Sequence, residues 1–309
     1  MKGKPALVLA AVTILWGSTF VVTKDLMRDT PPLAYLALRF ALGAATLGLV
    51  LMLTRSRTGR TRVDSAMFTN GIVLALLNSS GLLLQVIGQA YTTASKSSFI
   101  TSVSVPLTPV CALALYRARP TKPQKVAVVL ATLGLGLLTY PGGQARYNPG
   151  DLCTFGCAVV FAFTIVEMTR RSPGRDALAF ASVQVGSAAL FFAVLGVGAQ
   201  LLARVWHTPI LVLEARPLSL SPQLVLEIVY MGVVCTAVTF AAQTWAMARM
   251  TATAAAIVFA LEPVFATLMA ISLWGSAEWP SARGSVGAAL VLIAVAVAEI
   301  RLPGPRQVE

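Results

Sequence analysis

Ten apolar stretches divide the chain, and each has about the 20 residues that a helix needs to cross a bilayer. They lie near 5–23, 32–53, 66–90, 95–116, 124–140, 150–170, 177–203, 222–247, 251–274 and 283–302. Of the 309 residues, 57% are hydrophobic and only 12% are charged, which excludes a soluble globular protein. Since a bilayer core admits only helices and closed barrels, the sequence predicts an all-α integral membrane protein with ten transmembrane helices.

The two halves of the chain repeat each other. Pro106 and Pro123 recur as Pro263 and Pro280, and both pairs are offset by 157 residues. Each half holds five spans, so the second copy begins on the side where the first ended, and the repeats are inverted. We expect a first repeat at 1–145 and a second at 146–309, with a substrate site near the bilayer midplane between them.

The positive charges follow the loops. With a cytoplasmic N-terminus, sixteen Lys and Arg residues fall on the cytoplasmic side and seven on the other, with Arg39 inside a span. This is the positive-inside pattern, and ten spans return the C-terminus to the cytoplasm. The pattern predicts a multi-pass protein of the cell (inner) membrane. The same pattern explains the net charge of +12, because the positive residues lie in loops beside the membrane. We therefore expect the lipid bilayer, and no nucleic acid, as the partner.

The first apolar run has an alternative interpretation. Lys2 and Lys4 before that run also fit a secretory signal peptide. Removing the run would leave nine spans and unbalance the two halves, so a retained first span is preferred.

The residues that hold metals and cofactors are scarce. The single histidine, His207, lies in a loop without companion ligands, so we expect neither a metal nor a cofactor. The four cysteines all fall inside spans, where we expect them to pack against neighbouring helices: Cys111, Cys153, Cys157 and Cys235.

Three short segments point to a family. They read LWGSTF at 15–20, YTTASK at 91–96 and LEPVFA at 261–266. In these segments the chain resembles the drug/metabolite transporter superfamily, and within it permeases built from two EamA-type repeats. The resemblance implies ten helices, both termini in the cytoplasm, and transport of a small-molecule substrate. It does not name that substrate, because such permeases move amino acids, nucleotide sugars, sugar phosphates and drugs.

Amide side chains line one face of the third span. Asn78, Gln85 and Gln89 follow each other at steps of seven and four, which places them on one helical stripe. They fit either a polar lining that binds substrate or hydrogen bonds between helices. Gln89 is preferred for the lining because Gln243 is its repeat counterpart at an offset of 154. Gln243 shares a stripe with Thr239, so we expect a central cavity between the repeats.

Two charged side chains within spans are candidates for a function. Glu262 is the only carboxylate deep in the ninth span, where a charge costs about 2.5–3.5 kcal/mol. It could bind a cationic group or take up a proton, but a structural role beside the backbone distorted by Pro263 is preferred. Arg39 lies near the start of the second span and is expected to extend toward the interface. The alternative is that Arg39 contacts an anionic substrate group.

Aromatic residues offer further candidates for a cavity wall. Trp16, Phe99, Phe163 and Phe259 lie in spans, where most aromatics simply pack. Trp16 is the most informative, because the small residues that follow it allow close approach of another helix.

Prolines mark expected bends. Pro106 and Pro109 should bend the fourth span, and Pro263 the ninth. The bend in the fourth span would expose Ser102 and its polar neighbours toward the bundle interior. These paired bends are candidate gating elements.

A secondary transporter is the function that fits these features best. We expect export of small organic metabolites such as amino acids by alternating access. A multidrug exporter is the alternative, and a channel or an intramembrane enzyme is a remote one. The sequence lacks the phosphate-binding loop of an ATPase, so substrate gradients, exchange or ions must supply the energy. It leaves proton coupling, exchange and oligomeric state open.

Overall fold

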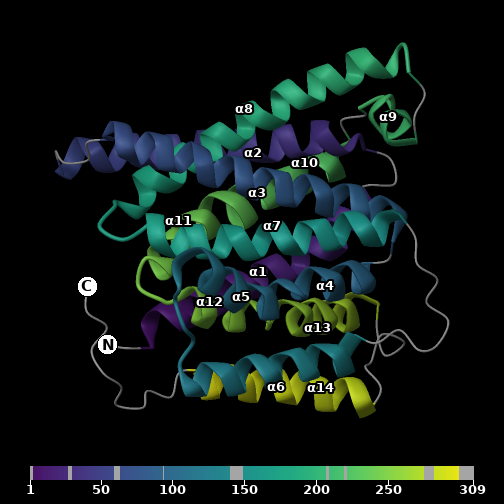
Figure 1. Ribbon diagram of the computed structural model, residues 1–309. Helices are drawn as coiled ribbons and strands as arrows, with labels where there is room; N and C mark the ends of the chain where they lie inside the picture. Colours follow the sequence, from purple (N-terminus) through teal and green to yellow (C-terminus); the bar gives the residue numbers. More distant parts are fainter. Residues whose placement is uncertain are drawn as a thin grey trace.

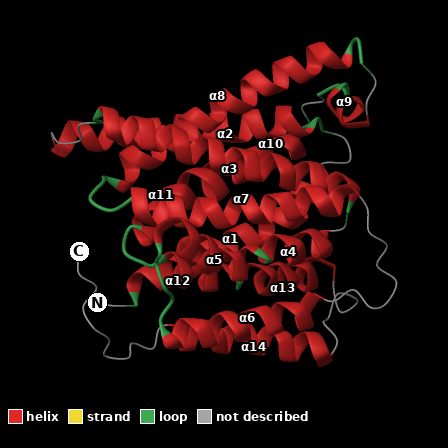
Figure 2. Cartoon of the chain, in the orientation of Figure 1, coloured by secondary structure: helices red, strands yellow, loops and turns green. Residues whose placement is uncertain are grey.

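The computed structural model describes residues 3–26, 30–58, 63–92, 94–139, 149–206, 209–218, 221–274 and 282–298. Within these ranges the chain is helical and contains no strand (Figure 2). The helices of the first half are α1 Lys4–Leu26, α2 Pro32–Thr58, α3 Ser65–Tyr91, α4 Ala94–Ser102, α5 Ser104–Tyr116 and α6 Lys122–Thr139. Those of the second are α7 Pro149–Arg171, α8 Ala177–Ala203, α9 Pro209–Glu214, α10 Pro222–Val229, the π-helix η1 Tyr230–Val238, α11 Thr239–Met247, α12 Ala252–Phe259, α13 Glu262–Trp274 and α14 Ala282–Ala298.

In the described part of the chain, these helices form ten rods that match the ten predicted spans. Three rods consist of consecutive segments: α4 with α5, α10 with η1 and α11, and α12 with α13. Seven of the rods are long and apolar enough to cross a bilayer by length and composition, and α1 and α14 contain shorter apolar helices. The prediction of an all-α membrane protein is confirmed.

The helix boundaries themselves repeat. α1 and α7 both have 23 residues and are offset by 145 at both ends, and α2 and α8 both have 27 residues at the same offset. The later rods begin 157 to 160 residues apart. The offset grows where the second half carries α9, which has no counterpart among the described residues of the first half. The predicted boundary between residues 145 and 146 lies outside the described residues.

The packing follows the same repeat. α6 packs along α14, and α2 along α8, so each of these pairs joins equivalent helices of the two halves (Figure 1). The pairing of α3 with α7 recurs as that of α11 with α1, and α4 and α5 contact α7 as α12 and α13 contact α1. Exchanging the two halves therefore leaves these contacts unchanged, as expected for an inverted repeat.

Two rods break at equivalent places. The fourth changes direction at Val103 between α4 and α5, and the ninth at Ala260 and Leu261 between α12 and α13. Pro106 and Pro263 follow in the first turn of α5 and of α13, where a missing backbone N–H costs little. Since both breaks end in the middle of a span, backbone and polar side chains meet the interior of the bundle there.

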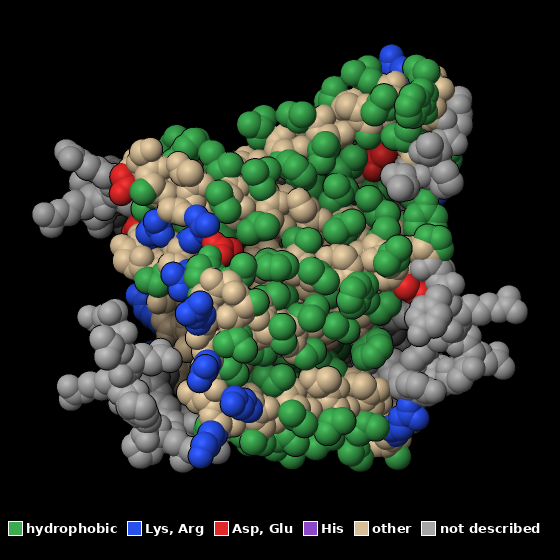
Figure 3. All heavy atoms as spheres, in the orientation of Figure 1, with side chains coloured by type: hydrophobic (Ala, Val, Ile, Leu, Met, Phe, Trp, Pro, Cys, Tyr) green, Lys and Arg blue, Asp and Glu red, His purple; other side chains and the backbone are tan. Residues whose placement is uncertain are grey.

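Basic side chains gather at one end of the bundle, at the left of Figure 3. This end carries the connections after α5, α7 and α11, together with the start of α1 and the end of α14 (Figure 1). Of the Lys and Arg residues whose side chains the structure describes, nine lie at this end: Lys4, Arg117, Arg119, Lys122, Lys125, Arg170, Arg171, Arg175 and Arg249. Three lie at the other end: Arg204, Arg216 and Arg283.

Candidate functional site

A cavity lies between the two halves of the bundle. It contains about 760 Å³ of space free of protein atoms, including the part that opens outward, which limits an occupant to a small organic molecule. Its lining comes from α1 to α5 of the first half and from α7, α11, α12 and α13 of the second. The lining residues are Trp16, Thr19, Arg39, Asn78, Leu82, Gln85, Thr101, Ser102, Ser104, Val105, Phe161, Thr164, Ile165, Phe240, Gln243, Phe259 and Glu262.

Most of this lining obeys the repeat. Trp16 and Thr19 on α1 correspond at the offset of 145 to Phe161 and Thr164 on α7. At offsets of 157 and 158 the lining pairs Ser102 with Phe259, Val105 with Glu262, Leu82 with Phe240, and Gln85 with Gln243. The cavity is therefore built from equivalent surfaces of both halves, as expected for a site on the repeat interface.

One wall of the cavity is aromatic. The Trp16 indole stacks on Phe259, with ring centroids 5.6 Å apart, and meets Phe240 edge-on at 6.4 Å. Its Nε1 donates to Thr239 Oγ1 at 3.2 Å and to the Cys235 carbonyl at 3.3 Å. These hydrogen bonds fix the plane of the indole, so the wall is held rigidly before any ligand arrives.

A π-helix sits beside this wall. The segment η1 widens the helix at 230–238, and such insertions are frequent at functional sites. It approaches α2 closely at two glycines: a Cβ on Gly43 would lie 2.9 Å from Thr236 Cγ2, and one on Gly232 would lie 2.9 Å from the Arg39 carbonyl. The close approach brings the Thr236 hydroxyl and the Cys235 carbonyl within hydrogen-bonding distance of the Arg39 side chain.

Arg39 is held inside the protein by these groups. Its Nε donates to Thr236 Oγ1 at 2.9 Å, its Nη2 to the Cys235 carbonyl at 3.3 Å, and its Nη1 to the Tyr35 hydroxyl at 3.4 Å. The residue is only 5% exposed and lines the cavity. The expectation that it extends toward the membrane interface is wrong, because the π-helix supplies acceptors within the bundle.

Glu262 begins α13 directly after the break at Ala260 and Leu261. Its side chain lines the cavity and accepts no hydrogen bond from the described residues. The structure does not show the preferred structural role, in which the carboxylate would cap the distorted backbone. The α13 N-terminus carries a partial positive charge, which favours a carboxylate at this position.

The other predicted site residues divide into two groups. Asn78, Gln85, Ser102 and Gln243 line the cavity together with Trp16, Phe259, Arg39 and Glu262. The second group does not line it, and consists of Gln89, Phe99, Phe163 and Thr239 together with Pro106, Pro109 and Pro263. Of these, Thr239 lies behind the wall and orients Trp16.

Two misses have simple geometric causes. Phe161 lines the cavity in place of Phe163, since residues two apart on a helix point in nearly opposite directions. Gln89 lies one turn beyond Gln85 and is 2% exposed. The cavity pairs Gln85 with Gln243, so the offset of 154 derived from Gln89 does not describe the lining.

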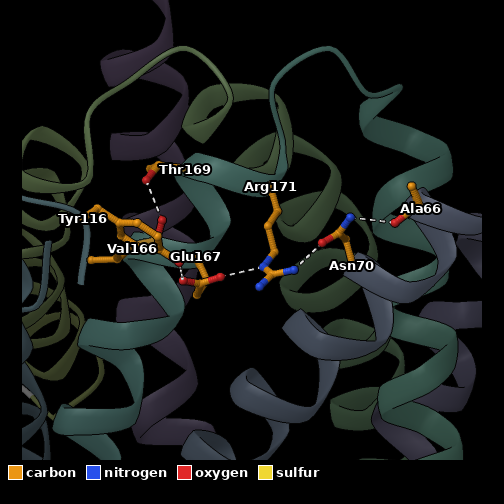
Figure 4. Close-up of polar contacts among 7 residues, drawn as sticks. All are labelled: Ala66, Asn70, Tyr116, Val166, Glu167, Thr169 and Arg171. Carbon is orange, nitrogen blue, oxygen red and sulfur yellow. Dashed lines mark hydrogen bonds and ion pairs between the residues drawn. The ribbon is translucent and has the colours of Figure 1, made fainter. Parts of the chain in front are cut away.

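Four polar side chains at the basic end form a connected hydrogen-bonded cluster. We call Asn70, Tyr116, Glu167 and Arg171 the basic-end cluster (Figure 4). The Glu167 carboxylate accepts hydrogen bonds from the Tyr116 hydroxyl and from Arg171 Nε, and Arg171 Nη1 donates to Asn70 Oδ1. The Arg171–Glu167 ion pair measures 2.6 Å. The cluster joins α3, α5 and α7, so its charges hold helices together.

The described residues contain no group of three His, Cys, Asp or Glu side chains that could hold a metal ion. His207 lies outside the described residues. All four cysteines are free thiols.

Comparison with known proteins agrees with this architecture. The model of the EamA-like transporter family matches the chain twice, over residues 3–140 and 148–299. An uncharacterized transporter of Archaeoglobus fulgidus is 26% identical over 294 residues, which cover 95% of this chain and 85% of the relative. One protein of known crystal structure superposes with a TM-score of 0.74 at 18% identity. The match covers 96% of this chain and 99% of that one, and it shows a shared fold.

Proposed function

Because this chain belongs to the EamA-like transporter family, we propose that it is a secondary carrier that exports small organic metabolites such as amino acids by alternating access. The observation that carries the proposal is the central cavity, whose lining pairs residues of the two halves at the repeat offsets. In inverted-repeat carriers one half rocks against the other around such a site.

In this proposal, the helices that move during transport are the two interrupted ones, α4 with α5 and α12 with α13. The breaks at Val103 and at Ala260 and Leu261 lie beside cavity residues of α5 and α13. Pro106 and Pro263, just after the breaks, lack the backbone N–H that would continue the preceding helix, and Pro109 lies within α5. We assign the gating role to these two elements, since each can tilt without breaking the hydrogen bonds of a full span.

The lining supports a small polar solute better than the alternatives. Amides and hydroxyls from Asn78, Gln85, Thr101 and Gln243 offer neutral hydrogen-bonding groups. A nucleotide sugar would require several cationic groups for its phosphates, and among the described lining residues Arg39 is the one cation. The aromatic wall favours the second candidate, an exporter of amphipathic drugs, which would bind mainly through Trp16 and its neighbours.

The positions of the charges support a location in the cell (inner) membrane with both termini cytoplasmic. Among Lys and Arg residues with described side chains, nine lie at the end where α1 begins and α14 ends, against three at the opposite end. A green fluorescent protein fused after Glu309 should fluoresce in intact bacterial cells. A fusion that stays dark while a periplasmic reporter at the same position is active would reverse the topology.

Counterflow in proteoliposomes tests the carrier. We expect saturable uptake of a radiolabelled amino acid into vesicles loaded with the same amino acid. Thr19→Trp should abolish it by filling the cavity, whereas Thr132→Trp should not, because Thr132 is exposed on α6. The two sites are well matched, since each threonine hydroxyl binds a carbonyl of its own helix at 2.7 Å. Equal loss in both variants, or uptake that does not saturate, would contradict the proposal.

Export and energy coupling need separate tests. Cells that overproduce the protein and are loaded with a dipeptide should release the constituent amino acids faster than cells with the Thr19→Trp variant. Proton coupling through Glu262 predicts that Glu262→Gln changes the pH dependence of transport. An unchanged pH dependence would contradict proton coupling through Glu262 and leave substrate gradients or exchange to drive transport.

A further inference from the structure

Two side chains of opposite charge line the cavity, and neither has an ionic partner. Arg39 binds three neutral acceptors, and in the described part of the chain no carboxylate forms an ion pair with it. Glu262 faces the same cavity, likewise without a cation or a hydrogen-bond donor among the described residues. Arg39 is buried and Glu262 is half-buried. A charge at such a position within the membrane is unfavourable until something neutralises it.

The repeat shows that the fold does not require these charges. At the offset of 145, Arg39 corresponds to Gln184, which is buried and neutral. At the offset of 157, Glu262 corresponds to Val105, which lines the cavity and is apolar. The equivalent positions of the other half therefore fold with an uncharged side chain. Each half contributes one charge that its counterpart lacks, and the two charges meet at one cavity.

Two N–H groups of the Arg39 guanidinium have no acceptor among the described residues. The guanidinium carries five N–H groups, of which its three acceptors use one on each nitrogen. One N–H remains on each terminal nitrogen, which is the number that a carboxylate accepts in a bidentate pair. Because Thr236 and Cys235 hold the side chain in place, little rotamer freedom is left to lose when a ligand binds.

We infer that Arg39 and Glu262 together select a zwitterion, a small solute whose carboxylate binds Arg39 and whose ammonium binds Glu262. The inference rests on the proposed function, since it names the ligand class of the same cavity. A zwitterion neutralises both side chains and leaves the net charge of the cavity unchanged. An amine or an acid alone neutralises one of them and leaves the other without an ionic partner.

The rest of the cavity narrows the class to α-amino acids with an apolar or aromatic side chain. The wall formed by Trp16, Phe240 and Phe259 offers ring faces and edges for such a side chain. Sugars, which carry neither charge, would leave both ionic groups unpaired.

Binding to the purified full-length protein in detergent tests this inference independently of transport. The ligands are phenylalanine, its decarboxylated analogue phenethylamine, and its deaminated analogue 3-phenylpropionate, with leucine, 3-methylbutylamine and 4-methylpentanoate as a second series. Dissociation constants are measured by isothermal titration calorimetry. We expect each amino acid to bind at least tenfold more tightly than either analogue.

Two variants assign the preference to the two side chains. Arg39→Gln should bring phenylalanine and phenethylamine within threefold of each other, because the carboxylate then gains nothing. Glu262→Gln should do the same for phenylalanine and 3-phenylpropionate. Arg119→Gln, on the connection after α5, is the control and should keep the full preference.

The inference is overturned if the amino acids and their analogues bind equally to the wild-type protein, or if only solutes without both charges bind. It is also overturned if both variants weaken all ligands alike. Binding of the amino acids and their analogues to the wild-type protein tests zwitterion selection by itself. The inference therefore remains testable even if a variant does not fold. Loss of counterflow with the binding preference intact would instead contradict the carrier proposal.

Discussion

The central cavity and the basic-end cluster each contain a buried charged side chain, but they differ in whether the charges have ionic partners. In the cluster, the Glu167 carboxylate accepts hydrogen bonds from Tyr116 and Arg171, so both charged side chains have a partner. In the cavity, Arg39 and Glu262 share one space and remain unpaired among the described residues. A buried charge that is paired holds helices together, whereas one that is unpaired and faces a cavity is available to a ligand.

The contrast matters because composition alone does not separate the two regions. Each contains an Arg, a carboxylate and neighbouring aromatics. What differs is the partner of each charge, and that depends on which helices the fold brings together. The following variants test whether the distinction holds, beginning with the largest expected effect.

Arg39→Met should raise the KM of the transported amino acid about 10- to 150-fold, because hydrogen bonds to a charged group contribute about 1.5–3 kcal/mol. The midpoint of thermal unfolding should not fall, since the change removes an unpaired buried charge and keeps the volume of the side chain. Counterflow and thermal unfolding of one preparation measure both. A lower midpoint with an unchanged KM would place Arg39 among the structural residues.

Glu167→Ala should show the opposite pattern. It removes the acceptor of the Tyr116 hydroxyl and of Arg171 Nε, so we expect a loss of about 1–3 kcal/mol of stability with an unchanged KM. Thermal unfolding in detergent measures the loss. Asn70→Ala, which removes one outer contact of the cluster, is the milder control. A raised KM in Glu167→Ala would mean that the cluster takes part in binding.

Thr236→Val sharpens the account of Arg39. The change keeps the shape of the side chain but removes the acceptor of Arg39 Nε, which lies 2.9 Å away. We expect KM to rise about fivefold, since a hydrogen bond contributes roughly 1 kcal/mol and the remaining two acceptors still hold the guanidinium. Thr132→Val on the exposed face of α6 should leave KM unchanged. A KM that does not respond would show that the π-helix does not position Arg39.

Glu214, which belongs to neither the cavity nor the basic-end cluster, should give the smallest effect. It lies on α9, between two spans, and accepts a hydrogen bond from the Leu33 backbone N–H at 2.9 Å. Burial raises the pKa of this carboxyl from 4.5 to about 7. The folded protein thus keeps a proton that the unfolded chain releases near pH 4.5. The stability that Glu214 contributes is full below pH 4.5 and is lost as the pH rises through 7.

The midpoint of thermal unfolding should therefore fall between pH 5 and pH 7 more steeply in the wild type than in Glu214→Gln. The amide of the variant can still accept the Leu33 N–H. Ligand affinity should be equal in the two proteins, because Glu214 does not line the cavity. Identical pH profiles would show that Glu214 does not titrate in this range.

The sequence predicted the ten spans because a bilayer imposes length and apolarity on every one of them. It predicted the breaks before Pro106 and Pro263 because proline removes a backbone donor wherever it stands. The side-chain register was harder. Matching letters suggested Gln89 as the partner of Gln243, but the structure places Gln85 in the cavity lining and buries Gln89 one turn further along α3.

The role of Arg39 could not be read from its own helix. Its acceptors Thr236 and Cys235 lie almost two hundred residues away, and they reach it through a π-helix packed against Gly43. No local pattern encodes that contact. The offset of 145, in contrast, was available in the sequence, and applied to Trp16 it would have found Phe161.

The measurement that tests the central claim most directly is protection of single cysteines by substrate, in a protein whose four native cysteines are replaced by alanine. Ser102→Cys places the thiol in the cavity, and Asn70→Cys places it in the basic-end cluster. Phenylalanine at saturating concentration should slow maleimide labelling of Ser102→Cys at least tenfold and leave Asn70→Cys unaffected. Equal rates with and without phenylalanine at Ser102→Cys, while counterflow persists, would contradict a binding site between the repeats.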